Sequence, residues 1–307
     1  PRAHLISALV VAEAQAGAVL REIEYVHQAL HGAGLELTLL KGAAYLLAGL
    51  PASKGRLFSD MDILTPHEQL PHVEATLMLS GWANTHHDPY DQRYYREWMH
   101  ELPPMLHIKR MTVIDVHHAI VPTTADLKPS SAKLLAAAQP VAGWPGVKVL
   151  APVDMVLHSA THLFYNEEFS HGLRDMSDLD LLLRHFSQQN DFWNALLTRA
   201  DELGLGRPLY YCLHYCTQLF ATPIPVAIMQ SAKNAAPSGY LARLMDDLWL
   251  HVLNSLHPSA ETSGMHANIA QQILYIRAHW HKMPFGLLAY HLLMKSLRPK
   301  SKTEEQS

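Results

Sequence analysis

The hydrophobic pattern of the chain changes near residue 150, and this change limits the folds that it can adopt. Before that point, short apolar runs alternate with segments of helical periodicity, separated by Gly and Pro turns. After Pro152 the periodicity is helical throughout, without a strong strand pattern. We therefore expect an α+β protein, with a mixed β-sheet and flanking helices in residues 1–150 and a helical domain in residues 151–300. The polar tail, residues 301–307, is expected to be disordered.

The hydrophobic pattern of residues 1–150 predicts short strands and helices in a defined order. The pattern predicts a hairpin in which two strands meet near residues 110 and 111, and a loop rich in His, Asp and Tyr between residue 86 and that hairpin. Helices are expected at residues 4–31, 41–50 and 66–80, and strands at residues 35–40, 60–64, 82–86, 104–109, 112–120 and 147–150.

Composition narrows the classes of function. Apolar residues make up 49% of the 307 residues, which is enough for a sizeable core, and the formal net charge is -4 without a long Lys/Arg run. This charge gives no signature of binding to nucleic acid or to acidic membranes. Glu13, Arg21 and Glu22 interrupt the N-terminal apolar stretch, so we expect no membrane span and a cytoplasmic protein. The only cysteines, Cys212 and Cys216, exclude a disulfide framework and are typical of a buried helix face.

Two carboxylates lie on one apolar strand in the segment RLFSDMDIL. Side chains alternate along a strand, so Asp60 and Asp62 point to the same face, where like charges repel. In the segment TVIDVHHAI, Asp115 and His117 likewise share a face. Three carboxylates on neighbouring strands suit Mg²⁺, which prefers hard oxygen ligands. The alternative is that these are ordinary surface residues at strand ends, because Asp-x-Asp is common by chance.

A candidate phosphate site precedes these carboxylates. The strand at residues 35–40 ends at Lys41-Gly42 and runs into a helix. A glycine at such a turn lets backbone N–H groups approach a phosphate, and the helix N-terminus favours negative charge. Lys41 and Arg56 are candidate cationic contacts for a triphosphate.

In this order of elements, the chain resembles the polymerase-beta-like nucleotidyltransferase superfamily. More closely, it resembles a group of bacterial proteins known as uncharacterised nucleotidyltransferases. The resemblance runs from about Leu39 to Phe186, whereas residues 190–307 resemble no family that we can name. It rests on the segments LLKGAAYLLAGLP, R-x-x-S-D-M-D-I-L, ELPPMLHIKRMTVIDVHHAI, VLAPVDMVLHSATHLF and LRDMSDLDLLLRHF.

The resemblance implies a metal-dependent transfer reaction. A hydroxyl of a small molecule or protein would attack the α-phosphate of a nucleoside triphosphate such as ATP and release pyrophosphate. Two metal ions can stabilise both the attacking and the leaving oxygen, and the third carboxylate, nearest the acceptor, can help to remove the proton. By resemblance, Asp60, Asp62 and Asp115 would bind Mg²⁺ or Mn²⁺, and Lys41, Gly42, Arg56 and Ser59 would bind the nucleotide. The chain departs from the superfamily at Gly42-Ala43, where Gly-Ser or Gly-Gly is usual, so it lacks the hydroxyl that a serine would offer to a phosphate.

Histidines in the second half form another candidate site. His158 and His162 lie four residues apart on one helix face, and Arg174, Asp175 and Asp178 lie close together on the next helix. His-x-x-x-His can bind zinc, but the Glu beside the first His that a metalloprotease requires is missing. We favour a polar cluster between the two halves. The residues expected in this cleft are His117, His158, His162, Arg174, Asp175 and Asp178.

Two other functions stay open from the sequence. One is a catalytically degenerate nucleotidyltransferase that binds a nucleotide or a partner protein, which the replacement of the usual Ser by Ala43 supports. The other is a metal-dependent phosphohydrolase. Its metal ligands would be His158, His162, His171 and Asp175. The position of the metal discriminates between the three functions. An active nucleotidyltransferase would bind it at the strand carboxylates, a phosphohydrolase at the helix imidazoles, and a degenerate protein would bind none.

Overall fold

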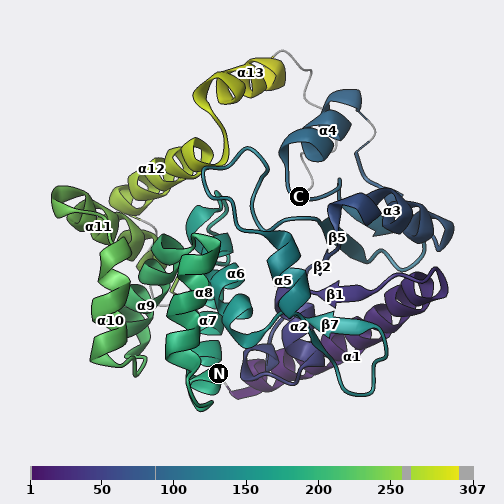
Figure 1. Ribbon diagram of the computed structural model, residues 1–307, viewed down its shortest axis with the longest axis horizontal. Coiled ribbons are helices and arrows are strands. Elements are labelled where there is room, and N and C mark those ends of the chain that lie inside the picture. Colours follow the sequence, from purple (N-terminus) through teal and green to yellow (C-terminus); the bar gives the residue numbers. More distant parts are fainter. Residues whose placement is uncertain (1, 87, 258–263, 297–307) are drawn as a thin grey trace.

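One mixed sheet organises the first half of the chain. The structure is a computed structural model that describes residues 2–86, 88–257 and 264–296, so the expected tail lies outside the described residues. Within them, seven strands pair in the order β3-β4-β5-β2-β1-β7-β6. Figure 1 labels the four neighbouring strands β5, β2, β1 and β7. Two pairs, β1 with β7 and β2 with β5, are parallel, and the others are antiparallel. The strands are β1 (Leu37–Leu39), β2 (Met61–Leu64), β3 (Trp82–Asn84), β4 (Met105–His107), β5 (Val113–His117), β6 (Gln139–Pro140) and β7 (Val147–Val149).

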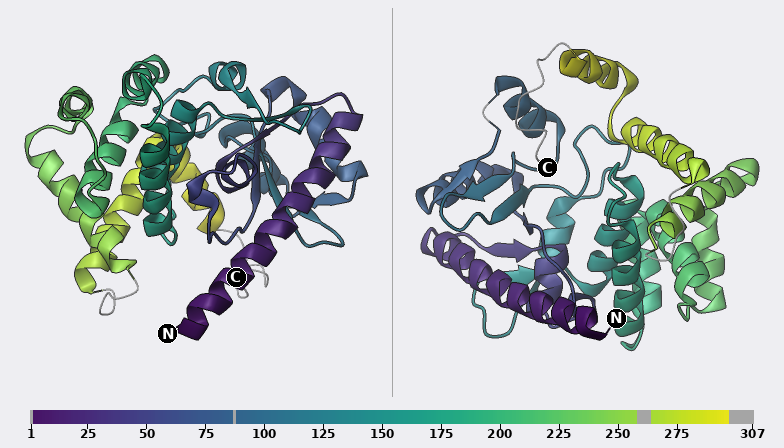
Figure 2. Two further views of the ribbon diagram at one scale, coloured as in Figure 1. Left: turned by 90° about the horizontal axis from the view of Figure 1, so that it is seen from below. Right: turned by 180° about the vertical axis from the view of Figure 1, so that it is seen from behind.

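Helices cover this sheet and form the rest of the molecule. The long helix α1 packs against α2, α3 and β1, and Figure 2 shows its N-terminal end extending beyond the sheet. The helices of the first half are α1 (Arg2–Gly32), α2 (Lys41–Leu47), α3 (Leu70–Leu79), α4 (Pro89–Arg93) and α5 (Ser131–Ala137). Those that follow the sheet are α6 (Pro152–Tyr165), α7 (Gly172–Phe186), α8 (Phe192–Leu203), α9 (Gly206–Phe220), α10 (Val226–Ala232), α11 (Gly239–Ser255), α12 (Met265–Lys282) and α13 (Phe285–Ser296).

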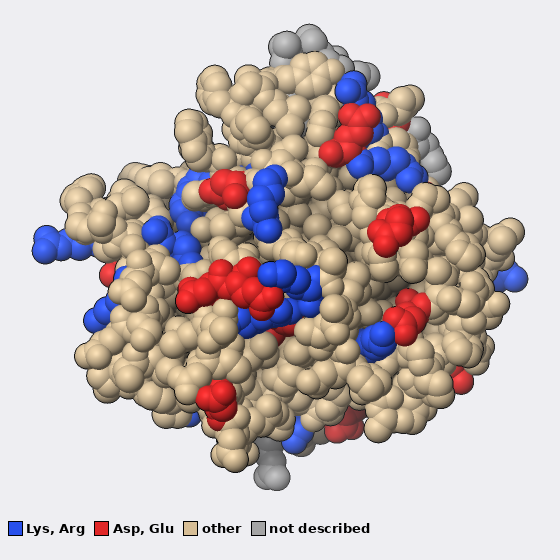
Figure 3. Space-filling view, in the orientation of Figure 1, with Lys and Arg blue, Asp and Glu red and all other residues tan. Residues whose placement is uncertain are grey.

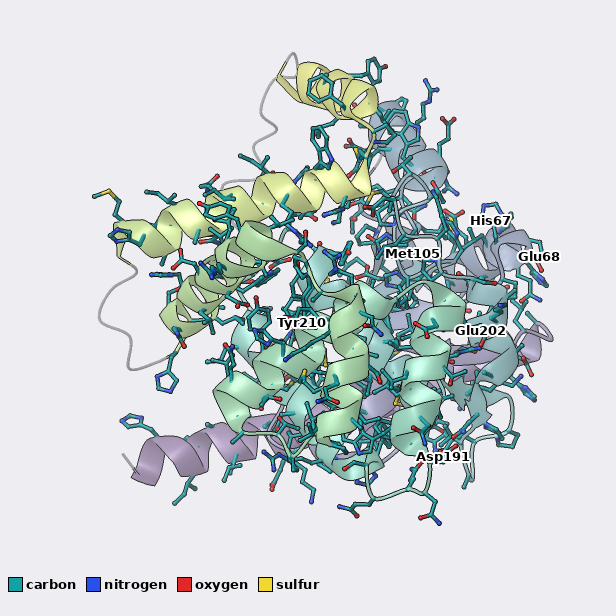
Figure 4. All side chains as sticks on the ribbon, turned by 60° about the vertical axis from the view of Figure 1, so that its left-hand side comes forward. His67, Glu68, Met105, Asp191, Glu202 and Tyr210 are labelled. Carbon is teal, nitrogen blue, oxygen red and sulfur yellow. The ribbon has the colours of Figure 1, made fainter. Side chains whose placement is uncertain are left out.

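The two halves share one hydrophobic core. Every residue of β1 and β2 is buried, since these central strands are covered on both faces. The cluster of buried side chains continues from the sheet into α6 and its neighbours, and it includes Met105 of β4 and Tyr210 of α9 (Figure 4). Phe164 packs edge-on against Trp249, with ring centroids 5.0 Å apart. This ring pair joins α6 to α11 within the helical half, and the shared core joins that half to the sheet.

The expected α+β class, the helix at residues 4–31 and the hairpin of β4 and β5 are confirmed. The loop expected after residue 86 is wrong in part, because α4 and a π-helical turn (Tyr94–Trp98) occupy it. Asp88 accepts a hydrogen bond from the backbone N–H of Tyr90 at 2.7 Å, and Pro89 occupies the first helical position. Both features are typical of a helix N-terminus. Helix α5 and strand β6 were not predicted either.

The described helices include none that is both long enough and apolar enough to cross a membrane.

A buried carboxylate ties α6 to α8. Asp154, in the first turn of α6, is fully buried, and Arg199 donates to both of its oxygens at 2.8 and 3.0 Å. The same guanidinium donates to the carbonyl of Lys133 and to the exposed carboxylate of Glu202. Figure 3 shows acidic and basic side chains lying side by side in this region of the surface.

We predict that Arg199→Leu lowers the free energy of unfolding by about 3 kcal/mol, because it leaves Asp154 buried without its counter-charge. Urea denaturation measures this change. Glu202→Gln is the matched control, since it removes the exposed partner of the same guanidinium and is expected to cost less than about 1 kcal/mol. Equal losses in the two variants would contradict the assignment of the buried pair as the stabilising contact.

Candidate active site

The register of two parallel strands brings the predicted carboxylates together. Strands β2 and β5 pair Asp62 with Asp115 and Leu64 with His117, so the acidic and imidazole side chains share one face of the sheet. Asp60 lies one residue before β2 and is exposed. These side chains line a cleft of about 590 Å³ between the sheet and the helical half. The cleft is also lined by Lys41, Gly42, Arg56, Ser59, His162, His171, Arg174, Asp175 and Asp178.

Asp62 is the best satisfied of the three carboxylates. It is 6% exposed, and its Oδ1 accepts from Lys41 Nζ at 3.4 Å and from His117 Nε2 at 2.8 Å. Burial alone would raise the pKa of Asp62, but Lys41 and the hydrogen bond from His117 outweigh it and hold the pKa well below its usual range. Both bonds go to Oδ1, so the second oxygen, Oδ2, is left available to a ligand in the cleft.

His117 lies between two carboxylates. Its Nε2 contacts Asp62, and its Nδ1 lies 3.2 Å from Glu101 Oε2. Burial disfavours the charged imidazolium, but Glu101 and Asp62 outweigh burial and raise the pKa of His117. The two carboxylates therefore favour the charged form of the ring more than water does.

Asp115 lacks such a partner. Its Oδ1 is buried and accepts no hydrogen bond from any residue that the structure describes. Burial, and then the neighbouring charges of Asp62 and Glu101, raise the pKa of Asp115 to about 7. Partial loss of hydration, together with Asp62, also raises the pKa of Asp60. An unpaired buried oxygen among several carboxylates suits a divalent cation, so the donor set of Asp60, Asp62 and Asp115 fits Mg²⁺ or Mn²⁺.

The turn from β1 into α2 presents Lys41 to this cluster. Lys41 has a φ of 44°, in the left-handed region that L-residues rarely adopt. Burial disfavours its charge, but Asp62 and Asp60 outweigh that effect and raise the pKa of Lys41. A Cβ atom on Gly42 would lie 2.9 Å from Arg56 Nε and 3.2 Å from the Phe58 ring. Glycine is therefore required here by the close approach of Arg56.

The other predicted nucleotide contacts already have protein partners. Arg56 forms an ion pair with Asp178 of α7, which links the sheet half to the helical half. Burial raises the pKa of Asp178 to about 6 despite this partner. Ser59 Oγ is exposed and donates to Asp60 Oδ1 at 2.9 Å.

The histidines of α6 differ from the predicted cluster in their contacts. His162 lines the cleft and lies 3.3 Å from the Asn166 amide, whereas His158 is 3% exposed and lies behind the cleft wall. Burial and the charge of Lys41 lower the pKa of His158 to about 3. Among the described residues, no hydrogen bond joins either histidine to the acidic and basic residues of α7. There Arg174 donates to Asp175 at 3.0 Å.

Glu101 and His100 are site residues that the sequence analysis missed. An isolated β-bridge places Glu101 opposite His117, at the end of β5. Of the described residues, His100, Glu101 and His117 form the one group of three whose possible ligand atoms lie within 4.8 Å of one another. Among the described residues, neither the imidazole set expected for a phosphohydrolase nor the set of Asp60, Asp62 and Asp115 forms such a group. The only local signal was the His-Glu pair just before a strand, and that pair indicates nothing without the bridge.

Residues near the C-terminal end of the described chain also reach the cleft. Lys282 of α12 donates to Asn166 Oδ1 at 2.8 Å and forms an ion pair with Glu167. The backbone carbonyl of Lys282 accepts from Thr124 Oγ1 at 2.7 Å, which ties α12 to the segment after β5. The helical periodicity of α12 gave no indication of this role.

The comparison with protein families agrees with this geometry. A family model described as "Uncharacterised nucleotidyltransferase" matches residues 1–221. The chain belongs to this family of uncharacterised nucleotidyltransferases. The match continues beyond Phe186, so the expectation that residues 190–307 resemble no family is wrong for residues 190–221. Neither the curated proteins nor the solved structures contain a match to the chain.

We predict that Asp115→Asn stabilises the metal-free protein, and more so at high pH. The folded-state pKa lies above the unfolded value of about 3.9, so folding favours the protonated carboxyl. That contribution is complete below the unfolded pKa and is lost as the pH rises through about 7. The gain from Asn should therefore grow with pH between these two values, from on the order of 1 kcal/mol near pH 5 to about 4 kcal/mol at most near pH 8.

Urea denaturation at both pH values in the presence of EDTA measures this gain. The control is Asp60→Asn, which removes an exposed carboxylate of the same cluster and should give a smaller gain. A gain from Asp115→Asn that does not change with pH would show that the charge of Asp115 does not destabilise the folded protein.

Proposed function

We propose that the protein is a metal-dependent nucleotidyltransferase that transfers a nucleoside monophosphate from a nucleoside triphosphate to a hydroxyl acceptor. The observation that carries the proposal is the pairing of Asp62 with Asp115 across β2 and β5. This pair lies in a cleft with Asp60 at its edge, and Asp115 has a buried oxygen without a protein partner. The acceptor would be a small molecule or a protein side chain.

The carboxylates would hold the metal. Asp60, Asp62 and Asp115 would bind Mg²⁺ or Mn²⁺, with Asp62 contributing the Oδ2 that the bonds from Lys41 and His117 leave available. The bound ions would neutralise phosphate charge and stabilise the attacking and leaving oxygens. Asp115, nearest the acceptor, would also help to accept the proton of the acceptor hydroxyl.

Cationic and aromatic side chains would bind the nucleotide. Lys41 would contact the triphosphate, exchanging part of its contact with Asp62 for a phosphate oxygen, and Arg56 would add charge from its position beside Gly42. Tyr94 and Tyr95, in the π-helical turn, line the same cleft and offer ring faces for stacking on a base. A cleft of about 590 Å³ falls in the usual range for small-molecule sites, about 300–1,000 Å³.

A catalytically degenerate nucleotide-binding protein is the second candidate. Residue 43 is an alanine, which has no hydroxyl to offer a phosphate, and its side chain is buried. Lys41 also pairs with a carboxylate rather than facing open solvent. Transfer activity discriminates between the two candidates, whereas nucleotide binding alone does not.

The function is tested by separating nucleotide binding from transfer. We predict that Asp115→Asn keeps most of the nucleotide affinity but loses transfer by at least about 100-fold, because it removes a metal ligand and the proton acceptor. Lys41→Gly should weaken nucleotide binding first, and glycine tolerates the φ of 44°. Asp60→Asn should abolish Mg²⁺-dependent nucleotide binding without lowering the melting temperature.

Thermal shift with the four nucleoside triphosphates, with and without Mg²⁺, measures binding, and pyrophosphate release with a panel of hydroxyl acceptors measures transfer. His171→Ala is the control, since it changes an exposed imidazole that takes part in none of the proposed metal or nucleotide contacts. Transfer by Asp115→Asn at the parental rate would refute the three-carboxylate site. Nucleotide binding without transfer, insensitive to Asp115→Asn, would favour the degenerate protein.

A further inference from the structure

A second group of possible metal ligands lies beside the carboxylates. Residues 100 and 101 follow the π-helical turn, and the bridge from Glu101 to His117 fixes them against the end of β5. Glu101 Oε2 lies 3.2 Å from His117 Nδ1 and 3.9 Å from His100 Nε2. All three side chains line the cleft.

The distances suit two imidazoles and one carboxylate around one ion. Two ligand atoms that share a tetrahedral Zn²⁺ at about 2.0–2.1 Å lie about 3.3 Å apart. The separation of 3.2 Å between Glu101 and His117 meets this condition, and a small rotation of the partly exposed His100 ring would bring its nitrogen into range. Imidazole donors select first-row transition metals over Mg²⁺, which prefers oxygen ligands.

Two further observations point to a ligand rather than to a structural cluster. The buried Nδ1 of His100 has no hydrogen-bond partner in the described part of the chain, although buried polar atoms usually have one, so a turn of the ring could present this nitrogen to an ion in place of Nε2. His117 presents its other nitrogen, Nε2, to Asp62 at 2.8 Å. A carboxylate on the far nitrogen is the usual arrangement for orienting a metal-binding histidine.

Charge balance favours a cation at the same place. The ion pairs of Glu101 are with His100 and His117, and no Lys or Arg among the described residues forms an ion pair with it. Lys41, the cation that faces this cluster, is paired with Asp62. Glu101 therefore adds an acidic side chain to a wall that already holds more carboxylates than cations.

We propose that His100, Glu101 and His117 bind a first-row transition-metal ion, with Zn²⁺ as the probe. This site is separate from the Mg²⁺ or Mn²⁺ site of the aspartates. Three protein ligands leave at least one coordination position, which faces the cleft and is available to water or to an oxygen of the acceptor. The proposal stands whether or not the protein transfers nucleotides.

The test is Zn²⁺ binding by the untagged full chain, after EDTA treatment, with millimolar Mg²⁺ present to occupy the aspartates. Elemental analysis after gel filtration gives the stoichiometry, competition with a chromophoric chelator gives the affinity, and Co²⁺ absorption reports the ligand geometry. We expect about one Zn²⁺ per chain. His100→Ala and Glu101→Gln should each weaken Zn²⁺ binding by at least on the order of 100-fold, and melting curves check that both variants are folded.

Three variants locate the ion. Asp60→Asn should keep the Zn²⁺ and lose the Mg²⁺-dependent nucleotide binding, which separates this proposal from the proposed function. His171→Ala and His158→Gln should keep the Zn²⁺ as well, since these imidazoles lie outside the group. The proposal is overturned if the parental chain binds no stoichiometric Zn²⁺, or if Zn²⁺ survives both His100→Ala and Glu101→Gln. Loss of Zn²⁺ in Asp60→Asn or in His158→Gln would also overturn it.

Discussion

Two carboxylates face each other across parallel strands, and the surrounding site is arranged to balance their charge. The register of β2 and β5 leaves Asp62 opposite Asp115, in a partly buried position where like charges repel strongly. Lys41 and His117 compensate Asp62, which keeps its pKa low. No described side chain donates to the buried oxygen of Asp115, and burial, together with the charge of Asp62, raises its pKa. The charged form of Asp115 is destabilised in the metal-free protein, and a bound cation would offset this loss.

The left-handed turn at Lys41 contributes to the same compensation of charge. The left-handed backbone of Lys41 brings its ammonium over Asp62, and Gly42 lets Arg56 pack directly on the turn. Arg56 then reaches Asp178 on α7, so the phosphate side of the cleft is fixed to the helical half. The two halves also share one hydrophobic core, which fixes the walls of the cleft relative to each other. We propose that the chain is organised as two domains that meet near residue 150.

Side-chain alternation was enough to predict the shared face, because a strand has only two faces and both segments had one apolar face. It placed Asp115 and His117 together, and the pairing of β2 with β5 follows this pattern. Alternation could not supply Glu101, whose position depends on a single β-bridge to a residue 16 positions away in the sequence. The helix after residue 86 was missed although Asp88-Pro89 is a good N-terminal signal, because the polar composition of the segment outweighed it.

The same limit explains the histidines. A spacing of four residues shows that His158 and His162 share a helix face, but it cannot show which of them reaches the cleft, because the answer depends on how α6 packs against the sheet. The place of Arg56 before Asp-x-Asp likewise could not show that it pairs with Asp178, which lies 122 residues further along the chain.

The two proposed metal sites would be coupled through one ring. His117 contacts Asp62 through Nε2 and Glu101 through Nδ1, so an ion bound to Nδ1 would fix the orientation of the group that orients Asp62. Asp62 receives both of its hydrogen bonds on Oδ1, which directs Oδ2 away from them. A metal at Glu101 would therefore hold the aspartate in the rotamer that keeps Oδ2 available. This gives a physical reason for a transition-metal site to lie beside a magnesium site rather than elsewhere in the cleft.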